Sequence, residues 1–252
     1  LPHREGTVSG VAGDRGEGRP VSRPRSRPGD GRGTRLLSGA PDPPAALPPP
    51  VRPATLLPFD LVLAGVGGQG VLTAAALVTE TARRAGLTVR QGEIHGMSQR
   101  GGAVTAHVRV AAGPVRSEVV ERGAASMVLA LEPLEALRSL PWLADGGVVV
   151  SAASPVENMP GYPPLEEVLA ELHRLPGAVV VDARAQAREA GSAKAENVVL
   201  LGAAARWLPF PTQALREVVA SWFEGHGEGM ATRNLRAFDA GLAAAAGSDA
   251  PG

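Results

Sequence analysis

The chain has 252 residues, of which 44% are apolar and only 3% aromatic, so it can form one large or two small domains with a core of Val, Leu and Ala. It contains no cysteine, which excludes disulfides, a thiolate nucleophile and an iron–sulfur cluster of its own. The formal net charge is zero, and the sequence has neither a run of about 18 apolar residues nor the apolar core of a secretory signal. We therefore expect a cytoplasmic protein that does not insert into membranes.

Residues 1–55 contain 11 of the 23 prolines, nine glycines and no aromatic residue. Such a segment cannot bury enough apolar area to offset the entropy of ordering it, so we predict a disordered Arg/Pro/Gly-rich extension. Its nine arginines could contact phosphates, but they are interspersed with five acids and no aromatic residue stacks on bases. We expect no nucleic-acid partner. Residues 247–252 are predicted to be a disordered tail.

Order is predicted to begin at Phe59. Residues 59–64 predict a buried strand, because glycines end the apolar run after six residues. Residues 71–85 predict a helix that ends before Gly86, and residues 87–94 predict a second strand. Residues 103–110 and 115–120 predict a hairpin with His107 and Arg109 on one face, which adds antiparallel pairing to the sheet.

The rest of the chain alternates strands and helices and then becomes helical. Strands are predicted over 126–131, 147–150 and 178–182, with a helix over 132–140. Helices are predicted over 195–208, 212–223 and 230–245. This order predicts an α/β fold with a Rossmann-like mixed, mostly parallel sheet flanked by helices. Residues 56–246 form one domain with a helical C-terminal third.

The most informative motif is Gly65-Val66-Gly67-Gly68-Gln69-Gly70, between the first strand and the first helix. It fits the dinucleotide fingerprint, in which one glycine makes a tight turn, the next permits close approach to a phosphate, and the last packs helix on strand. The side-chain amide of Gln69 departs from that pattern and offers a donor and an acceptor to whatever lies over the loop. The alternative is a turn that needs glycine for packing alone.

Nicotinamide binding also requires an acid at the end of the second strand, to hold a ribose. Glu93 lies near that place, but Arg90 and Gln91 are as well positioned, so this test leaves both interpretations open.

A second polar loop, His95 to Gly102, follows the second strand. Arg100 could clamp a carboxylate or phosphate with two hydrogen bonds. His95 could carry a proton near neutral pH or donate to a backbone carbonyl. The density of polar groups between two apolar strands favours a functional surface. The remaining histidines show no metal-ligand spacing, so we expect no metal site and assign no catalytic residue.

Together the two loops resemble the small, gamma-type subunits of the thiamine diphosphate-dependent 2-oxoacid:ferredoxin oxidoreductases. The resemblance is carried by residues 65–71 and 93–102, with support from residues 131–137, 197–203 and 234–238. It covers about residues 59–242 and favours the branch that acts on arylpyruvates such as indolepyruvate. The N-terminal extension departs from the family.

The resemblance implies that a large alpha subunit carries thiamine diphosphate, Mg²⁺ and iron–sulfur clusters, with a 2-oxoacid as substrate, coenzyme A as co-substrate and ferredoxin as electron acceptor. This chain would bind no cofactor alone and be inactive alone. Its two loops would face the partner, the substrate or coenzyme A. The candidate site residues are Gly65, Gly67, Gly68, Gln69, Gly70, His95, Ser98, Gln99, Arg100, Gly101 and Gly102.

Two alternatives remain at this point. The glycine motif alone fits a free-standing NAD(P)-binding oxidoreductase, and the fold alone fits a non-catalytic interaction module.

Overall fold

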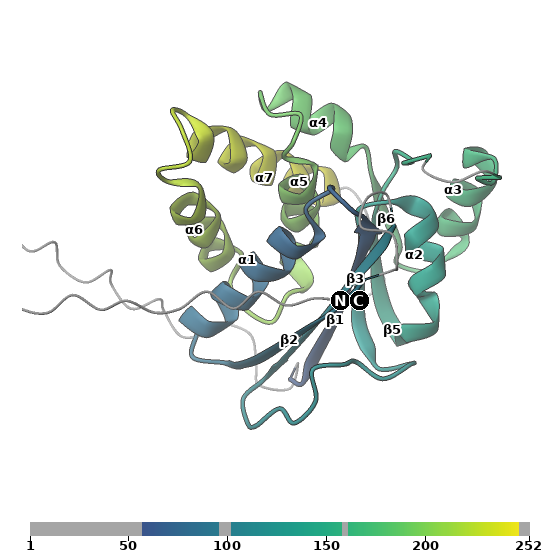
Figure 1. Cartoon of the computed structure of the whole chain (residues 1–252), viewed down its shortest axis with the longest axis horizontal. Helices are drawn as coiled ribbons and strands as arrows, with labels where there is room; N and C mark the ends of the chain where they lie inside the picture. The colour runs from purple at the N-terminus through teal and green to yellow at the C-terminus, as the bar shows by residue number, and fades with distance from the viewer. Residues whose placement is uncertain (1–56, 96–101, 158–160, 247–252) are drawn as a thin grey trace, which may run out of the picture. The chain divides into compact units, whose positions relative to one another are not determined.

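The computed structural model describes residues 57–95, 102–157 and 161–246 (Figure 1). The predicted disordered segments 1–55 and 247–252 lie outside these ranges. The strands are β1 (Phe59–Val66), β2 (Thr88–His95), β3 (Ala103–Ala111), β4 (Ala125–Ala130), β5 (Leu143–Ala152) and β6 (Val179–Val181). The helices are α1 (Val71–Arg84), α2 (Pro133–Ser139), α3 (Leu165–Arg174), α4 (Ala183–Glu189), α5 (Glu196–Ala204), α6 (Thr212–Phe223) and α7 (Met230–Ala246), with 3-10 turns η2 (Leu140–Trp142) and η3 (Ala205–Trp207).

The strands form one sheet in the order β2-β3-β1-β4-β5-β6. β1 pairs in parallel with β4, β4 with β5 and β5 with β6, whereas β3 is antiparallel to both β1 and β2. Five strands therefore point the same way and β3 alone runs against them, which confirms the predicted mixed, mostly parallel α/β sheet. All eight residues of β1 are buried, as expected for a strand with neighbours on both edges and layers on both faces.

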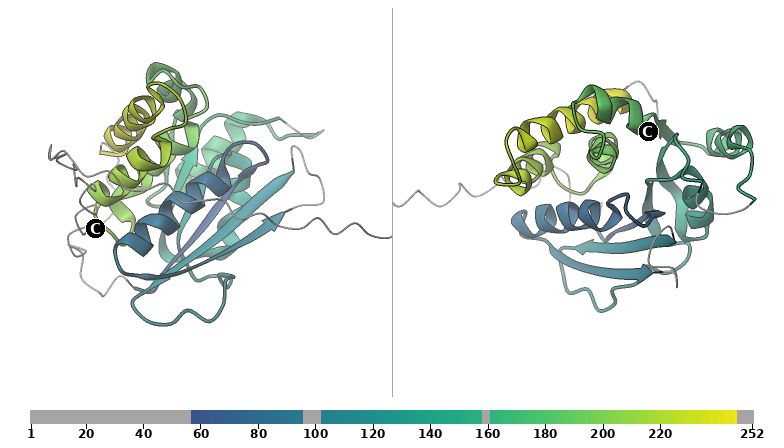
Figure 2. Two further views of the ribbon diagram at one scale, coloured as in Figure 1. Left: turned by 60° about the vertical axis from the view of Figure 1, so that its left-hand side comes forward. Right: turned by 45° about the horizontal axis from the view of Figure 1, so that its top comes forward.

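Helices cover both faces of the sheet (Figures 1 and 2). α1 lies against β1, β2 and β3, and α5, α6 and α7 pack beyond it on the same side. α2 packs on β1, β4 and β5 from the other side, with α3 next to it. Arg83 and Arg84 lie in the last turn of α1, and Gly86 follows in the left-handed conformation that ends the helix, as predicted.

α5 is the central helix of the α1 side. Eight of its nine residues are buried. Among the described residues, the contact between α5 and α7 is the most extensive contact between two helices. The two backbones touch at two glycines. A Cβ atom added at Gly202 would lie 2.0 Å from the carbonyl oxygen of Phe238, and one added at Gly241 would lie 1.8 Å from that of Val199. Only glycine fits these two positions.

The predicted hairpin between residues 103–110 and 115–120 is wrong. Both edges of β3 are occupied by β1 and β2, so no edge remains for a further strand. Residues 115–120 instead lie across the face of β3, where the Val120 amide donates to His107 Nδ1 (2.9 Å) and Arg109 donates to the Val119 carbonyl (3.3 Å). The expectation that His107 and Arg109 share a face is confirmed.

The other predicted elements are found with shifted ends. β5 starts four residues before the predicted strand, and the helix predicted over 195–208 is α5 followed by the 3-10 turn η3. α3 and α4 were not predicted. α3 is amphipathic, with Val168 and Leu172 buried and the remaining positions mostly charged or exposed.

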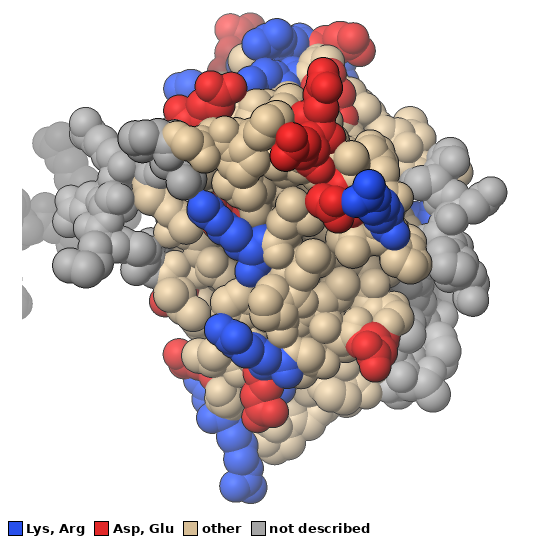
Figure 3. Space-filling model, turned by 90° about the vertical axis from the view of Figure 1, so that its right-hand side faces the viewer, with Lys and Arg blue, Asp and Glu red and all other residues tan. Residues whose placement is uncertain are grey.

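The side of the molecule that carries α2 and α3 shows charges of both signs around broad uncharged areas, with no continuous basic surface (Figure 3). Within the described ranges, none of the helices combines the length and the apolar character that crossing a bilayer requires.

Candidate functional site

The glycine loop meets Gly102, the last residue of the second predicted loop, at one edge of the sheet. The glycine loop, residues 65–70, joins the carboxyl end of β1 to α1, and Gly102 directly precedes β3, whose first residue pairs with Val66. The Gly67 amide donates to the Gly102 carbonyl at 3.0 Å. The side chain of His95 and residues 96–101, which include Ser98, Gln99, Arg100 and Gly101, lie outside the described residues.

Two glycines of the loop, Gly65 and Gly70, serve different purposes from those predicted. Gly65 is part of β1, and a Cβ atom there would lie 2.8 Å from Val71 and 3.1 Å from Leu131, so it allows close packing rather than a turn. Gly70 adopts a left-handed conformation (φ +86°) at the N-terminus of α1, and a Cβ atom there would lie 2.6 Å from the side-chain amide of Asn197. The last glycine therefore makes the turn and packs against α5.

Gln69 fastens the loop across the sheet. Its Oε1 accepts from the Val66 amide and its Nε2 donates to the Leu131 carbonyl, both at 2.7 Å. The side chain thus ties the end of β1 to the end of β4, where connections diverge to opposite faces and ligands of open α/β sheets usually bind. The amide was predicted to face a ligand, but these two hydrogen bonds are made within the chain.

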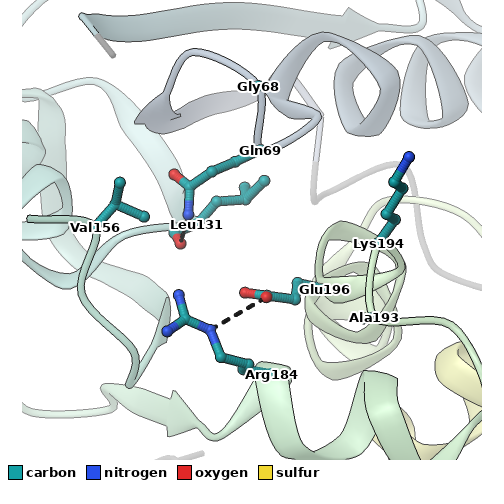
Figure 4. A pocket seen from close by; sticks show the side chains of 8 residues that line it. All are labelled: Gly68, Gln69, Leu131, Val156, Arg184, Ala193, Lys194 and Glu196. Carbon is teal, nitrogen blue, oxygen red and sulfur yellow. Dashed lines mark hydrogen bonds and ion pairs between the residues drawn. The ribbon is translucent and has the colours of Figure 1, made fainter. Parts of the chain in front are cut away.

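An open cavity of about 350 Å³ lies beside Gln69 (Figure 4). We call it the edge cavity. It is lined by Gly68, Gln69, Leu131, Val156, Arg184, Ala193, Lys194 and Glu196.

Arg184 and Lys194 bring positive charge to the edge cavity. Arg184 Nε contacts Glu196 Oε1 at 3.3 Å, and its Nη2 donates to the Pro155 carbonyl at 3.3 Å. Lys194 is exposed, makes no hydrogen bond or ion pair with another described residue, and is the only lysine of the chain. A guanidinium and an ammonium at one opening can bind a carboxylate or a phosphate.

Sequence analysis did not predict these two charged residues, because neither belongs to a motif. Arg184 lies in α4, and Lys194 lies in the connection between α4 and α5. Composition was the one signal that could have drawn attention to Lys194, since 24 of the 25 cationic residues are arginine and Lys194 is the single lysine.

Two further recesses flank the glycine loop. One, of about 350 Å³, lies between the loop, the first turn of α1 and Val104. The other, of about 180 Å³, lies between α1, α5, α6 and α7 and includes the buried Asn197 and Asn234, which come from two of the stretches that carried the resemblance. The Asn197 amide donates to the Gly70 carbonyl at 3.3 Å, so it supports the loop from below. No group of three His, Asp or Glu side chains within the described ranges is placed to hold a metal ion.

The strand order argues against nicotinamide binding. In the dinucleotide fold the second strand lies directly beside the first, which brings its terminal acid to the ribose. Here β3 separates β2 from β1, so Glu93 lies one strand spacing, about 4.8 Å, further from the glycine loop. Gln91 Nε2 also donates to Glu93 at 3.1 Å.

Fold and site together define an α/β domain with a glycine-rich, partly cationic sheet edge. The family model described as pyruvate ferredoxin/flavodoxin oxidoreductase matches residues 60–244. The chain therefore belongs to the pyruvate ferredoxin/flavodoxin oxidoreductase family, as the resemblance of its two loops predicted.

Curated relatives have nearly the length of this domain. Indolepyruvate oxidoreductase subunit IorB of Methanothermobacter thermautotrophicus is 36% identical in an alignment 197 residues long that covers 75% of this chain and 99% of the relative. The protein of the same name from Pyrococcus horikoshii is 39% identical in an alignment 197 residues long that covers 74% of this chain and 96% of the relative. The pyruvate/ketoisovalerate oxidoreductases common subunit gamma of Thermococcus kodakarensis is 30% identical, covering 64% of this chain and 84% of that protein.

Solved structures share the fold. The gamma subunit of a keto/oxoacid ferredoxin oxidoreductase from Geobacter sulfurreducens superposes with a TM-score of 0.57 at 22% identity, covering 75% of this chain and 99% of that one. The 2-oxoglutarate:ferredoxin oxidoreductase of Magnetococcus marinus, solved with 2-oxoglutarate, coenzyme A and succinyl-CoA bound, superposes with a TM-score of 0.61 at 22% identity, covering 77% of this chain and 32% of that one.

Proposed function

We propose that this chain is the small subunit of a thiamine diphosphate-dependent 2-oxoacid:ferredoxin oxidoreductase that acts on indolepyruvate or a related arylpyruvate. The assembled cytoplasmic enzyme decarboxylates the 2-oxoacid oxidatively, transfers the acyl group to coenzyme A and reduces ferredoxin. The observation that carries the proposal is the match, at 36% and 39% identity, to almost the whole length of two proteins named as indolepyruvate oxidoreductase subunits.

The redox chemistry belongs to the large subunit. Iron–sulfur clusters need thiolate ligands, and this chain has no cysteine. Thiamine diphosphate with Mg²⁺ supplies the carbanion chemistry of decarboxylation when it is bound by the large subunit. This chain's own contribution is to complete the wall of the active site and to bind and orient anionic groups.

The described residues suit that contribution. Gly67 and Gly68 expose backbone without side chains, so another chain or a ligand can approach closely. Arg184 and Lys194 provide cationic groups for the carboxylate of the 2-oxoacid or the phosphates of coenzyme A. The predicted residues His95, Ser98, Gln99, Arg100 and Gly101 are proposed as further contacts to the partner, the substrate or coenzyme A.

Co-expression with a cluster-containing large subunit tests the proposal. The purified complex should reduce ferredoxin or a viologen dye in the presence of coenzyme A and indolepyruvate, with a higher kcat/KM for indolepyruvate than for pyruvate or 2-oxoglutarate. The isolated chain should show no activity with any of these substrates, because it holds no redox centre.

A complex without any 2-oxoacid-dependent activity would contradict the proposal, and so would a colour or an activity that stays with the isolated chain. The nicotinamide alternative is tested on the same material. A rise in the melting temperature of the isolated chain with NADH would support that alternative, whereas we expect no shift.

A further inference from the structure

One wall of the edge cavity is formed by the connection between β5 and α3, through Val156. The described parts of this connection are residues 153–157 and 161–164. At its start, the Ala153 amide donates to the Val181 carbonyl. Among the described residues, positions 154–157 and 161–163 make no backbone-to-backbone hydrogen bond, and the hydrogen bonds that attach them come from side chains.

Two side chains attach this connection. Arg184 Nη2 donates to the Pro155 carbonyl at 3.3 Å, and the buried carboxylate of Glu132 accepts from both described parts of the connection. Glu132 is only 1% exposed and lies directly after β4, next to Leu131, whose carbonyl accepts from Gln69. Its Oε1 accepts from the Tyr162 hydroxyl and, at 3.5 Å, from the Val156 amide. Its Oε2 accepts from the Glu135 amide at 2.9 Å and so caps α2.

These hydrogen bonds supply donors to both oxygens of the Glu132 carboxylate, and they link the two described parts of the connection to one side chain. A buried charge is tolerated when several donors surround it, and hydrogen bonds to an ionised acceptor are stronger than neutral ones. Burial, followed by the hydrogen bond to Glu132, raises the pKa of Tyr162 far above its ordinary value, so the phenol keeps its proton and remains a donor. Tyr162 is the only tyrosine of the chain.

We propose that Glu132 and Tyr162 are positioning residues that hold Val156 at the edge cavity and thereby set the affinity for the substrate that enters it. The inference rests on the proposed function, because the cavity has a substrate only in the assembled oxidoreductase. Neither residue lines the edge cavity itself. Their removal should change substrate binding and leave the chemical step largely unaffected.

The test is Tyr162→Phe in the co-expressed complex, with KM and kcat measured separately for the 2-oxoacid and for coenzyme A. We expect the KM of one of the two substrates to rise about tenfold, as for the loss of one hydrogen bond to a charged acceptor, while kcat stays within about twofold. Val156→Ala, which removes the wall side chain but keeps the attachment, should raise the KM of the same substrate.

The matched control is Ser139→Ala, which removes a buried hydroxyl at the other end of α2. It should lower the melting temperature without changing either KM.

A Tyr162→Phe complex with unchanged KM values would overturn the inference, whatever the melting temperature of that complex, since the role of Tyr162 would then be structural only. If Tyr162→Phe fails to assemble, Val156→Ala decides, because unchanged KM values there mean that the wall contacts no substrate. An inactive parent complex would instead contradict the proposed function, before any variant is compared.

Discussion

The two faces of the sheet differ in the ionisable side chains that they bury. On the side of α1, α5 and α7 the buried polar residues Thr81, Asn197 and Asn234 are uncharged and bond to nearby backbone carbonyls. The buried ionisable groups of the described chain lie on the side of α2 and α3 instead. They are Asp60, His107, Glu132 and Glu135.

Because of this difference, we expect the α5–α7 side and the α2–α3 side of the sheet to respond to different perturbations. The α5–α7 layer depends on backbone contact at Gly202 and Gly241, so it should be sensitive to added volume. The α2–α3 side depends on paired charges and one neutral imidazole, so it should be sensitive to charge deletion and pH. The edge cavity takes residues from both sides, Val156 from one and Lys194 from the other.

The largest effect is expected from Gly241→Ala. The new methyl carbon would lie 1.8 Å from the Val199 carbonyl oxygen, so α5 and α7 must move apart. We expect a loss of roughly 3 kcal/mol or more in the free energy of unfolding, measured by urea denaturation. Gly113→Ala is the control, because a Cβ atom there meets nothing within 4 Å. A Gly241→Ala chain as stable as this control would show that the helices are not in backbone contact.

The second prediction concerns charge on the other side. Asp60 is 5% exposed and accepts from Arg109 Nε at 2.9 Å and Nη2 at 3.0 Å. Asp60→Ala leaves a guanidinium that is largely shielded from water, so we expect a loss of about 2 kcal/mol in urea denaturation. Arg216 and Asp239 form an exposed pair with the same two-bond geometry, and Asp239→Ala should cost less than about 0.5 kcal/mol. Equal losses in the two variants would remove the proposed difference between buried and exposed pairs.

Local patterns were sufficient to predict β1, the glycine loop and α1, because the apolar run, the glycines and the terminal arginines lie within 30 residues of one another. α3 could also have been predicted, since it has acids in its first turn and His173 and Arg174 in its last. Residues 115–120 were mistaken for the second strand of a hairpin because they directly follow Gly113-Pro114, a pair typical of a turn between two strands.

Contacts between residues far apart in the chain could not be predicted from the sequence. β3 lies between β2 and β1 in the sheet, and no local sequence pattern shows which strands will pair with one another. The partners of Gln69 include a carbonyl 62 residues away. The edge cavity joins Val156, Arg184 and Lys194, whose spacing in the chain carries no motif.

The smallest effect, and the sharpest test of the comparison, is the response of His107 to pH. His107 is fully buried, and its Nδ1 accepts from the Val120 amide, which requires the neutral imidazole. Burial lowers its pKa, and the nearby Arg109 charge lowers it further, against an opposing contribution from Asp60.

The unfolded chain therefore binds a proton at His107 near pH 6.5, where the folded chain does not. The free energy of unfolding should fall as the pH drops below about 6.5 and continue to fall until the lower pKa of the folded state is reached. We expect His107→Gln to show a shallower slope over this range in urea denaturation, even though the variant is less stable at neutral pH. His173→Gln, which removes an exposed imidazole from α3, should keep the slope of the parent chain. If the His107 and His173 variants have equal slopes, acid sensitivity does not arise from the buried imidazole, and the contrast between the two faces is then one of paired charge alone.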